Sequence, residues 1–297
     1  LHKAIRRQRQ MCIRDSYYVE TPDKEIVTCK IKGKMKQVRF SAVTGDMVEF
    51  EKNPDGESMI KTILPRRNFM ERPAMANLDC IVIAFACADP DFSCLLADKM
   101  LAFAERAGIE AVLCLNKTDL VSEAQLEEIA GVYRKAGYTV FTVSTFNGTG
   151  IEALKEYLNG KISAFAGPSG VGKSSMLNAL QPGIALQTGK VSEKIGRGRH
   201  TTRYAQLLPF NGGYFADTPG FGNLLAENID ARELYKYFRE FKHFEHGCKF
   251  VPCTHTHEPV CGVKNAVEEG KIAASRYESY LAILDEIKLL KEKSGKR

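Results

Sequence analysis

The fold is decided by an eight-residue stretch, Gly167-Pro168-Ser169-Gly170-Val171-Gly172-Lys173-Ser174. It fits the pattern G-x-x-x-x-G-K-[S/T] of the loop that wraps the phosphates of a nucleoside triphosphate. The apolar run Ile162–Ala166 before it predicts a buried strand, and residues 174–180 after it predict the start of a helix. Glycines let backbone N–H groups turn toward phosphate oxygens, and a helix N-terminus favours negative charge. A glycine-rich surface turn is the alternative, but the flanking strand and helix favour nucleotide binding.

Length and composition are those of a globular protein with two or three domains. The chain has 297 residues, of which 44% are hydrophobic and 26% charged, and its formal net charge of +6 favours an anionic partner such as RNA. The longest unbroken apolar run, 81–88, is too short to cross a bilayer, so we expect no membrane association. Nine cysteines, an odd number with several in apolar surroundings, favour reduced thiols and a cytoplasmic location.

The N-terminal part predicts a small β-barrel behind a basic leader. Residues 1–15 are rich in Lys and Arg and show no period, so we expect a disordered or non-native leader there. Within 16–67, short alternating runs separated by turn residues predict an OB-type barrel that binds RNA. The basic residues from Lys30 to Arg39 favour a solvated hairpin, with an RNA-facing loop as the alternative. We expect a linker at 65–73.

Residues 68–225 predict an α/β domain with a parallel sheet. Apolar strands are expected at 79–85, 111–115 and 139–143, with helices between them. Such alternation indicates a parallel sheet covered on both faces. Two more strands are expected at 204–209 and 213–216, after a glycine-punctuated, basic segment at 187–202 that predicts a mobile loop.

A second motif indicates which nucleotide binds. Asn116-Lys117-Thr118-Asp119 stands at the carboxyl end of the 111–115 strand, where open parallel sheets bind ligands. Asp119 can accept two hydrogen bonds from guanine, whereas adenine lacks that donor pair and would leave the carboxylate unpaired. Ser144, at the end of the next strand, lies in a segment expected to present a backbone N–H to the guanine carbonyl. An ATPase or kinase is the alternative, and Asp119 argues against it.

A third motif, Asp217-Thr218-Pro219-Gly220, follows the 213–216 strand and completes the set. We expect the Gly220 N–H to sense the terminal phosphate and Lys173 to reach the terminal phosphates. Ser174, Asp217 and Thr202 are expected to bind Mg²⁺, with Thr201 as the alternative to Thr202. The residues expected to bind the nucleotide are Asn116, Lys117, Thr118, Asp119, Ser144, Gly167, Pro168, Ser169, Gly170, Val171, Gly172, Lys173, Ser174, Ser175, Asp217 and Gly220.

The order of these motifs is unusual, because the guanine motif precedes the phosphate loop. In ordinary small GTPases the phosphate loop comes first. A nucleotide site is a spatial constellation, so a circularly permuted chain can build it.

The C-terminal residues 226–297 predict a helical zinc-binding domain. Cys248, Cys253, His255 and Cys261 supply three thiolates and one imidazole within fourteen residues, which is the ligand set of a closed structural zinc site. His246 and His257 are the alternatives for the imidazole. A helix is expected from Asp230, with Leu234, Tyr237, Phe238 and Phe241 on one face. A long closing helix is expected over 268–291, with Ile272, Tyr280, Leu284 and Ile287 on or near one face.

The motif order and the cysteine spacing together resemble the ribosome small-subunit-dependent GTPase A family, from about residue 16 to the C-terminus. The resemblance implies a GTPase that binds the small (30S) ribosomal subunit and its rRNA late in maturation and couples GTP hydrolysis to its own release. It implies GTP or GDP, Mg²⁺ and one structural Zn²⁺ as cofactors. A monomer is expected. The alternative is a nucleotide-stabilised RNA-binding module with little hydrolysis.

Hydrolysis needs a group that orients water. The residue after Gly220 is Phe221, where many GTPases place a glutamine, and an apolar ring cannot hold water. His200 is the nearest candidate, and the resemblance also implies this loop histidine. The catalytic residues are therefore expected to be His200, Lys173 and Thr202. Contact of His200 with RNA or solvent is the alternative.

Overall fold

The computed structural model describes residues 4–11, 16–31, 42–53, 58–71, 73–183, 206–217 and 229–295, with the backbone alone for 4–11, Asp217 and 293–295. The chain divides into two compact units. The first unit comprises Leu1–Cys80, Lys155–Ala164 and Gln181–Phe221, and the second comprises Ile81–Leu154, Phe165–Leu180 and Gly222–Arg297. Within these described ranges, no helix has the length and apolar character needed to span a membrane.

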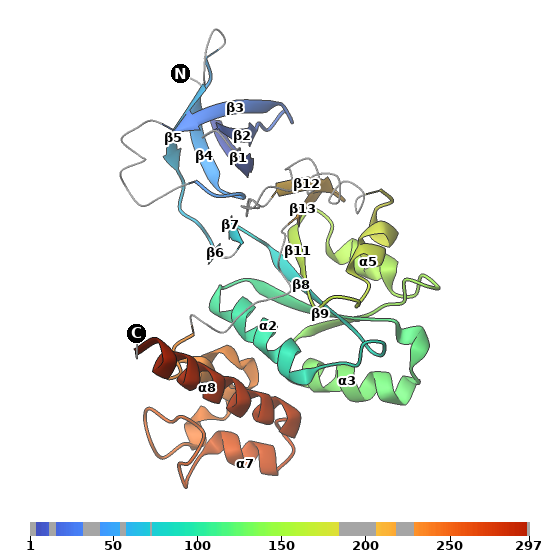
Figure 1. Ribbon diagram of the computed structural model, residues 1–297, viewed down its shortest axis with the longest axis vertical. Coiled ribbons are helices and arrows are strands. Elements are labelled where there is room, and N and C mark those ends of the chain that lie inside the picture. The colour runs from blue at the N-terminus through green and yellow to red at the C-terminus, as the bar shows by residue number, and fades with distance from the viewer. Residues whose placement is uncertain are drawn as a thin grey trace. The chain divides into compact units, whose positions relative to one another are not determined.

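Five strands of the first unit close into a barrel (Figure 1). They are hydrogen-bonded in the order β1-β2-β3-β5-β4, and β4 pairs back with β1. Val19, Val48 and Ile60 are fully buried in its core, as the alternating sequence pattern requires. This closed order is that of the predicted OB-type barrel. The strands are β1 (Ala4–Met11), β2 (Ser16–Glu20), β3 (Ile26–Ile31), β4 (Met47–Glu51) and β5 (Ser58–Ile63).

The expectation of a structureless leader over residues 1–15 is wrong for Ala4–Met11, which form β1. This strand pairs antiparallel with β2 and β4, and Gln10 stands opposite Gln206 of β12 (Gln206–Phe210). The segment has no hydrophobic period from which a strand could be predicted. It forms a strand through backbone hydrogen bonds to neighbouring strands, a tertiary context that sequence patterns do not reveal.

The expected linker at 65–73 contains a strand, which is a second correction. β6 (Phe69–Glu71) pairs with β7 (Ala74–Ala76) in a separate two-stranded sheet. Arg66 binds the buried carboxylate of Asp46 with two hydrogen bonds of 2.7 and 2.9 Å, so the segment is anchored to the barrel. Of the basic Lys30–Arg39 segment, residues 32–39 lie outside the described residues.

The remaining strands of the first unit precede and follow the phosphate loop in sequence. β11 (Ile162–Ala166) runs parallel to β13 (Gly213–Asp217), with Ala164 opposite Ala216. β12 forms an antiparallel hairpin with β13. Their bounds lie within two residues of the predicted strands, because apolar runs between turn residues are reliable strand signals.

The second unit contains the strand order β10-β9-β8 and the helices that follow each strand. Nearly every residue of β8 (Cys80–Ala86) and β9 (Glu110–Asn116) is buried, and β9 runs parallel to β10 (Thr139–Thr142). Serine caps start the helices: Ser93 caps α2 (Cys94–Arg106), and Ser122 forms a capping box with Gln125 at α3 (Glu123–Lys135). These elements agree with the predicted α/β pattern. Shorter elements are η1 (Thr118–Leu120), α4 (Ile151–Tyr157) and α5 (Lys173–Leu180).

The C-terminal segment departs from the predicted helices. The expected helix from Asp230 is three 3₁₀ turns, η3 (Leu234–Tyr237), η4 (Arg239–His243) and η5 (Glu245–Gly247), because Phe238 adopts an extended conformation that interrupts the helix. Leu234, Phe238 and Phe241 are buried all the same. The expected long helix over 268–291 is α8 (Ala274–Gly295), which begins six residues later than predicted. A separate short helix, α7 (Gly262–Glu268), precedes it and ends before Gly270, whose φ is +65°.

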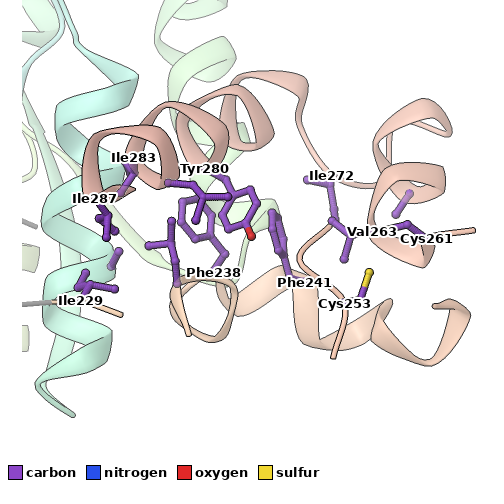
Figure 2. Packing of buried hydrophobic residues seen from close by; sticks show 14 residues of the cluster. Ile229, Phe238, Phe241, Cys253, Cys261, Val263, Ile272, Tyr280, Ile283 and Ile287 are labelled. Carbon is purple, nitrogen blue, oxygen red and sulfur yellow. The ribbon is translucent and has the colours of Figure 1, made fainter. Parts of the chain in front are cut away.

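One hydrophobic cluster holds the C-terminal elements together (Figure 2). The rings of Phe238, Phe241 and Tyr280 meet at its centre, with centroids 5.1–5.3 Å apart. Ala102 of α2 belongs to the same cluster, so the C-terminal segment packs on the α/β part of its own unit.

Candidate functional site

The phosphate loop connects β11 to α5 and depends on glycine where the backbone approaches neighbours. Gly167 has a φ of +141°, and a Cβ on it would stand 2.1 Å from the carbonyl oxygen of Ala84. Lys173 Nζ donates to the carbonyls of Gly167 at 2.9 Å and Pro168 at 2.5 Å, and burial lowers its pKa. Ser174 is exposed in the first turn of α5.

Asn116 joins the base motif to the phosphate loop. Its side chain is fully buried, its Nδ2 donates to the Val171 carbonyl at 2.9 Å, and its Oδ1 accepts from the Thr145 N–H at 3.3 Å. The next residue, Lys117, takes the left-handed conformation with φ +60°. Thr118 Oγ1 donates to the Val143 carbonyl at 3.2 Å. The motif therefore joins its own loop to the phosphate loop and to the loop that follows β10.

Asp119 is oriented by Ser144. The Ser144 hydroxyl donates a short hydrogen bond to the Asp119 carboxylate, and its oxygen accepts from the N–H groups of Phe146 at 3.2 Å and Asn147 at 3.4 Å. A carboxylate fixed in this way can accept a matched pair of N–H donors from a purine edge.

The backbone donors around Ser144 already have acceptors. The N–H of Val143 donates to Leu115 at 2.7 Å, and that of Ser144 donates to Thr149 at 3.0 Å. Compared with Val143 and Ser144, Thr145 differs in that its N–H uses a side-chain acceptor, Asn116, and its bond of 3.3 Å is the longest of the three. Of these three donors it is therefore the one most easily transferred to a ligand carbonyl.

The third motif is described only in part. Asp217 is the last residue of β13. The other expected residues of this region, His200, Thr201, Thr202, Gly220 and Phe221, lie outside the described residues.

Four side chains in the C-terminal domain converge as the cysteine spacing predicts. The ligand atoms of Cys248, Cys253, His255 and Cys261 all lie within 4.8 Å of one another. His255 Nδ1 is 3.6 Å from Cys248 Sγ and 3.3 Å from Cys261 Sγ, and these two sulfurs are 4.0 Å apart. A tetrahedral zinc site with ordinary bond lengths has sulfur–nitrogen and sulfur–sulfur edges of about 3.5 and about 3.8 Å. The cluster therefore fits a zinc ion.

The surroundings of this cluster disfavour isolated charges on its ligands. Burial lowers the pKa of His255 and raises that of Cys253 to about 12, since the apolar surroundings disfavour both charged forms. A bound cation would offset this cost for the thiolates. His246 and His257 are exposed, so His255 occupies the imidazole position.

Three further residues hold the loop that carries His255. Tyr277 and Tyr280 of α8 donate to the carbonyls of His255 at 2.7 Å and Thr254 at 2.6 Å. Glu258 accepts from the N–H and hydroxyl of Thr254 at 2.6 and 2.7 Å and from the Thr256 N–H at 2.9 Å. Sequence reasoning missed Glu258, although an acid just after two threonines between zinc ligands is a signal for such a turn.

Two family models match the sequence. The model described as RsgA N-terminal domain matches residues 13–60, and the one described as RsgA GTPase matches residues 63–227. The chain belongs to the RsgA GTPase family. As a member of this family it is a GTP hydrolase. This agrees with the guanine nucleotide predicted from the motif Asn116–Asp119.

Relatives in the RsgA family match nearly the whole chain. A small ribosomal subunit biogenesis GTPase RsgA from Caldanaerobacter subterraneus subsp. tengcongensis is 46% identical over 273 residues, which are 92% of each protein. Another from Thermotoga maritima is 45% identical over 267 residues, which are 89% of this chain and 90% of that one.

Solved structures agree on the fold. The crystal structure of YjeQ from Thermotoga maritima matches with a TM-score of 0.83 at 39% identity, over 95% of this chain and 98% of that chain. YloQ, described as a circularly permuted GTPase, matches with a TM-score of 0.81 at 29% identity, over 97% and 96%. The predicted fold class is confirmed: an OB-like barrel, a circularly permuted α/β GTPase domain and a helical domain with the cysteine cluster.

Proposed function

We propose that this GTPase binds the small (30S) ribosomal subunit, acts late in its maturation, and uses GTP hydrolysis to time its own release. The family relatives are named for small-subunit biogenesis, which supports the partner. The observation that carries the nucleotide part is the double role of Asn116, which bonds the phosphate loop through Val171 and the base loop through Thr145. One side chain thereby fixes the spacing between the two halves of a guanine-nucleotide site.

The base contacts follow from the orientation of the Asp119 carboxylate. Held by the Ser144 hydroxyl, it would accept the ring N–H and the exocyclic amine of guanine. The Thr145 N–H would turn from Asn116 to the guanine carbonyl, and the stem of Lys117 would cover the base. Asp119 is exposed, so the base itself would desolvate its carboxylate. Adenine would leave that carboxylate unpaired and should bind more weakly than guanine by factors of ~10⁴.

The phosphates would be held by backbone N–H groups of the glycine-rich loop and by Lys173. Its Nζ bonds to two loop carbonyls, which it would exchange for phosphate oxygens when GTP binds. Ser174, Asp217 and Thr202 would hold Mg²⁺, which supplies charge neutralisation at the β- and γ-phosphates. Asp217 at a strand end and the exposed Ser174 at a helix start support this assignment.

Hydrolysis is assigned to His200. Phe221 cannot orient water, and His200 lies in sequence beside the threonines expected to sense Mg²⁺. Its imidazole would position the attacking water, and contact with the ribosomal subunit would bring the loop into place.

The cysteine cluster would hold one structural zinc ion. Three thiolates and one imidazole close a tetrahedral site, which leaves no position for catalysis and makes the ion a staple for the C-terminal domain. The zinc domain and the OB-type barrel would contact rRNA, consistent with the net charge of +6. We further propose a monomer that works in the cytoplasm, where small subunits are assembled.

Release coupling is tested by co-sedimentation with purified small subunits. The protein should sediment with subunits when bound to a non-hydrolysable GTP analogue and should stay in the supernatant with GDP. Equal binding in both states would contradict the release step. It would favour the second candidate function, an RNA-binding module in which the nucleotide only stabilises the fold.

A further inference from the structure

A buried ionic cluster joins the C-terminal domain to helix α2. Arg276, near the start of α8, donates to Asp98 at 2.5 Å and to both oxygens of Glu240 at 2.7 and 3.0 Å. The side chains of Arg276, Asp98 and Glu240 are 2%, 0% and 7% exposed. Removing one member would leave a buried charge unpaired, so this joint is held tightly.

Aromatic contacts extend from this cluster into the loop between β8 and α2, residues 87–93. The Arg276 guanidinium lies 5.7 Å from the centroid of the Tyr133 ring. Tyr133 meets Phe92 edge-to-face with centroids 5.7 Å apart, and Phe92 meets Phe85 of β8 at 5.3 Å. Tyr133 is 1% exposed, and Phe92 is the half-buried residue through which the 87–93 loop enters this packing.

The same loop contacts the base motif and lies beside the phosphate loop of the candidate nucleotide site. The Cys87 N–H donates to the Asn116 carbonyl at 2.9 Å, and the Asp89 carbonyl accepts a short hydrogen bond from Lys117 Nζ. The Cδ of Pro90 stands 3.6 Å from where a Cβ on Gly170 would lie. The loop therefore contacts the base motif and lies beside the phosphate loop at one end, and at the other end it reaches the Arg276 cluster through Tyr133.

We propose that Arg276 is a positioning residue for the guanine-nucleotide site and acts through Tyr133 and Phe92 on the 87–93 loop. The inference rests on the proposed nucleotide site. Anchoring by Phe92 raises the fraction of molecules in which the 87–93 loop has the arrangement that supports Lys117 and Gly170. The apparent affinity for the nucleotide scales with this fraction. Because coupling is reciprocal, nucleotide binding would in turn favour one arrangement of the C-terminal domain toward its partner.

The test is GDP affinity in a double-mutant cycle of the full-length, zinc-loaded chain. We expect Arg276→Met and Phe92→Ala each to weaken GDP binding by about 5- to 50-fold, the usual range of such coupling. The double variant should bind GDP about as tightly as whichever single variant has the lower affinity. The two losses should not add, because both changes act through the same chain of contacts, from Arg276 through Tyr133 to Phe92. Arg239→Ala is the matched control, because Arg239 also joins the C-terminal domain to α2, at Glu105, near the helix end far from the loop. It should change affinity by less than about twofold.

A spectroscopic readout separates positioning from general destabilisation. The chain contains no tryptophan, so Phe92→Trp introduces a single reporter in the loop. Its emission should shift when GDP is added, and Arg276→Met in this background should alter the nucleotide-free emission well below the unfolding transition. Should Arg276→Met fail to fold, Asp98→Asn takes its place, since it keeps both bonds between Arg276 and Glu240.

Three outcomes would overturn the inference: unchanged GDP affinity in Arg276→Met, an equal loss in Arg239→Ala, or additive losses in the cycle. Failure of the unmodified chain to bind GDP would instead refute the proposed nucleotide site itself.

Discussion

Gly172 offers the sharpest perturbation of the nucleotide site. Its φ is +88°, and a Cβ at this position would stand 2.4 Å from Asn116 Nδ2, the atom that donates to the Val171 carbonyl. Gly172→Ala therefore strains the backbone and also displaces the amide that joins the phosphate loop to the base loop. Gly137 has the same φ of +88° with nothing within 4 Å of the corresponding Cβ, so Gly137→Ala reproduces the strain without the displacement.

The two effects have separable magnitudes. A left-handed alanine costs roughly 1–2 kcal/mol of folding stability in both variants. Loss of the buried Asn116–Val171 hydrogen bond leaves a desolvated carbonyl, which costs about 1–3 kcal/mol. Nucleotide binding requires the loop arrangement that this hydrogen bond holds, so the same cost is subtracted from the free energy of binding. At about 1.4 kcal/mol for each factor of ten, GDP should bind Gly172→Ala roughly 5- to 150-fold more weakly than the unmodified chain.

The assay is titration with a fluorescent GDP analogue, alongside thermal unfolding of each variant. We expect both variants to unfold at lower temperature, and Gly172→Ala alone to lose affinity. If Gly172→Ala bound GDP as tightly as Gly137→Ala, then Asn116 would not set the spacing of the two loops, and our reading of the site would be wrong.

Four further predictions concern separate parts of the molecule. Asp119→Asn should weaken GDP binding by more than about 100-fold and favour xanthosine diphosphate, whose carbonyl suits an amide donor; a competition assay that still prefers GDP would contradict the base assignment. His200→Ala should keep GTP binding and lose subunit-stimulated turnover in a phosphate-release assay; equal stimulation would remove His200 from catalysis. Cys261→Ser should purify with clearly less than one zinc per chain and unfold at lower temperature, whereas a full zinc content by elemental analysis would argue against this ligand. Burial alone would raise the pKa of Glu258, but hydrogen bonds from Thr254 and Thr256 outweigh it and lower the pKa to about 2. Because the folded pKa is depressed, the stabilisation is present at neutral pH and is lost as pH falls from about 5 toward 2. Glu258→Gln should therefore be destabilising at pH 7, and acid unfolding curves should show that its effect becomes progressively smaller as pH falls.

The α/β elements could be predicted because their signals are local. Buried strands such as Ile162–Ala166 are continuous apolar runs, and the phosphate and base motifs combine rare residue types at fixed spacing. The convergence of Cys248 with Cys261 followed from ligand spacing alone, because few other arrangements explain three cysteines and a histidine so close together.

Other features depend on contacts distant in sequence. The segment Ala4–Met11 has no strand-like pattern and becomes a strand only through its pairing with β2 and β4. The 3₁₀ turns from Leu234 onward keep the helical spacing of buried residues, so the pattern alone cannot distinguish them from an α-helix. The pairing of Arg276 with Asp98, 178 residues away, was not predictable from either residue, although an acid on the apolar face of a helix is a signal that a buried partner exists.

The most direct test of the central claim is phosphate release from GTP by the purified chain, with and without purified small ribosomal subunits. We predict slow release by the chain alone, a large acceleration by small subunits, and no comparable release from ATP. A GTP hydrolysis rate that small subunits leave unchanged would contradict the proposed function.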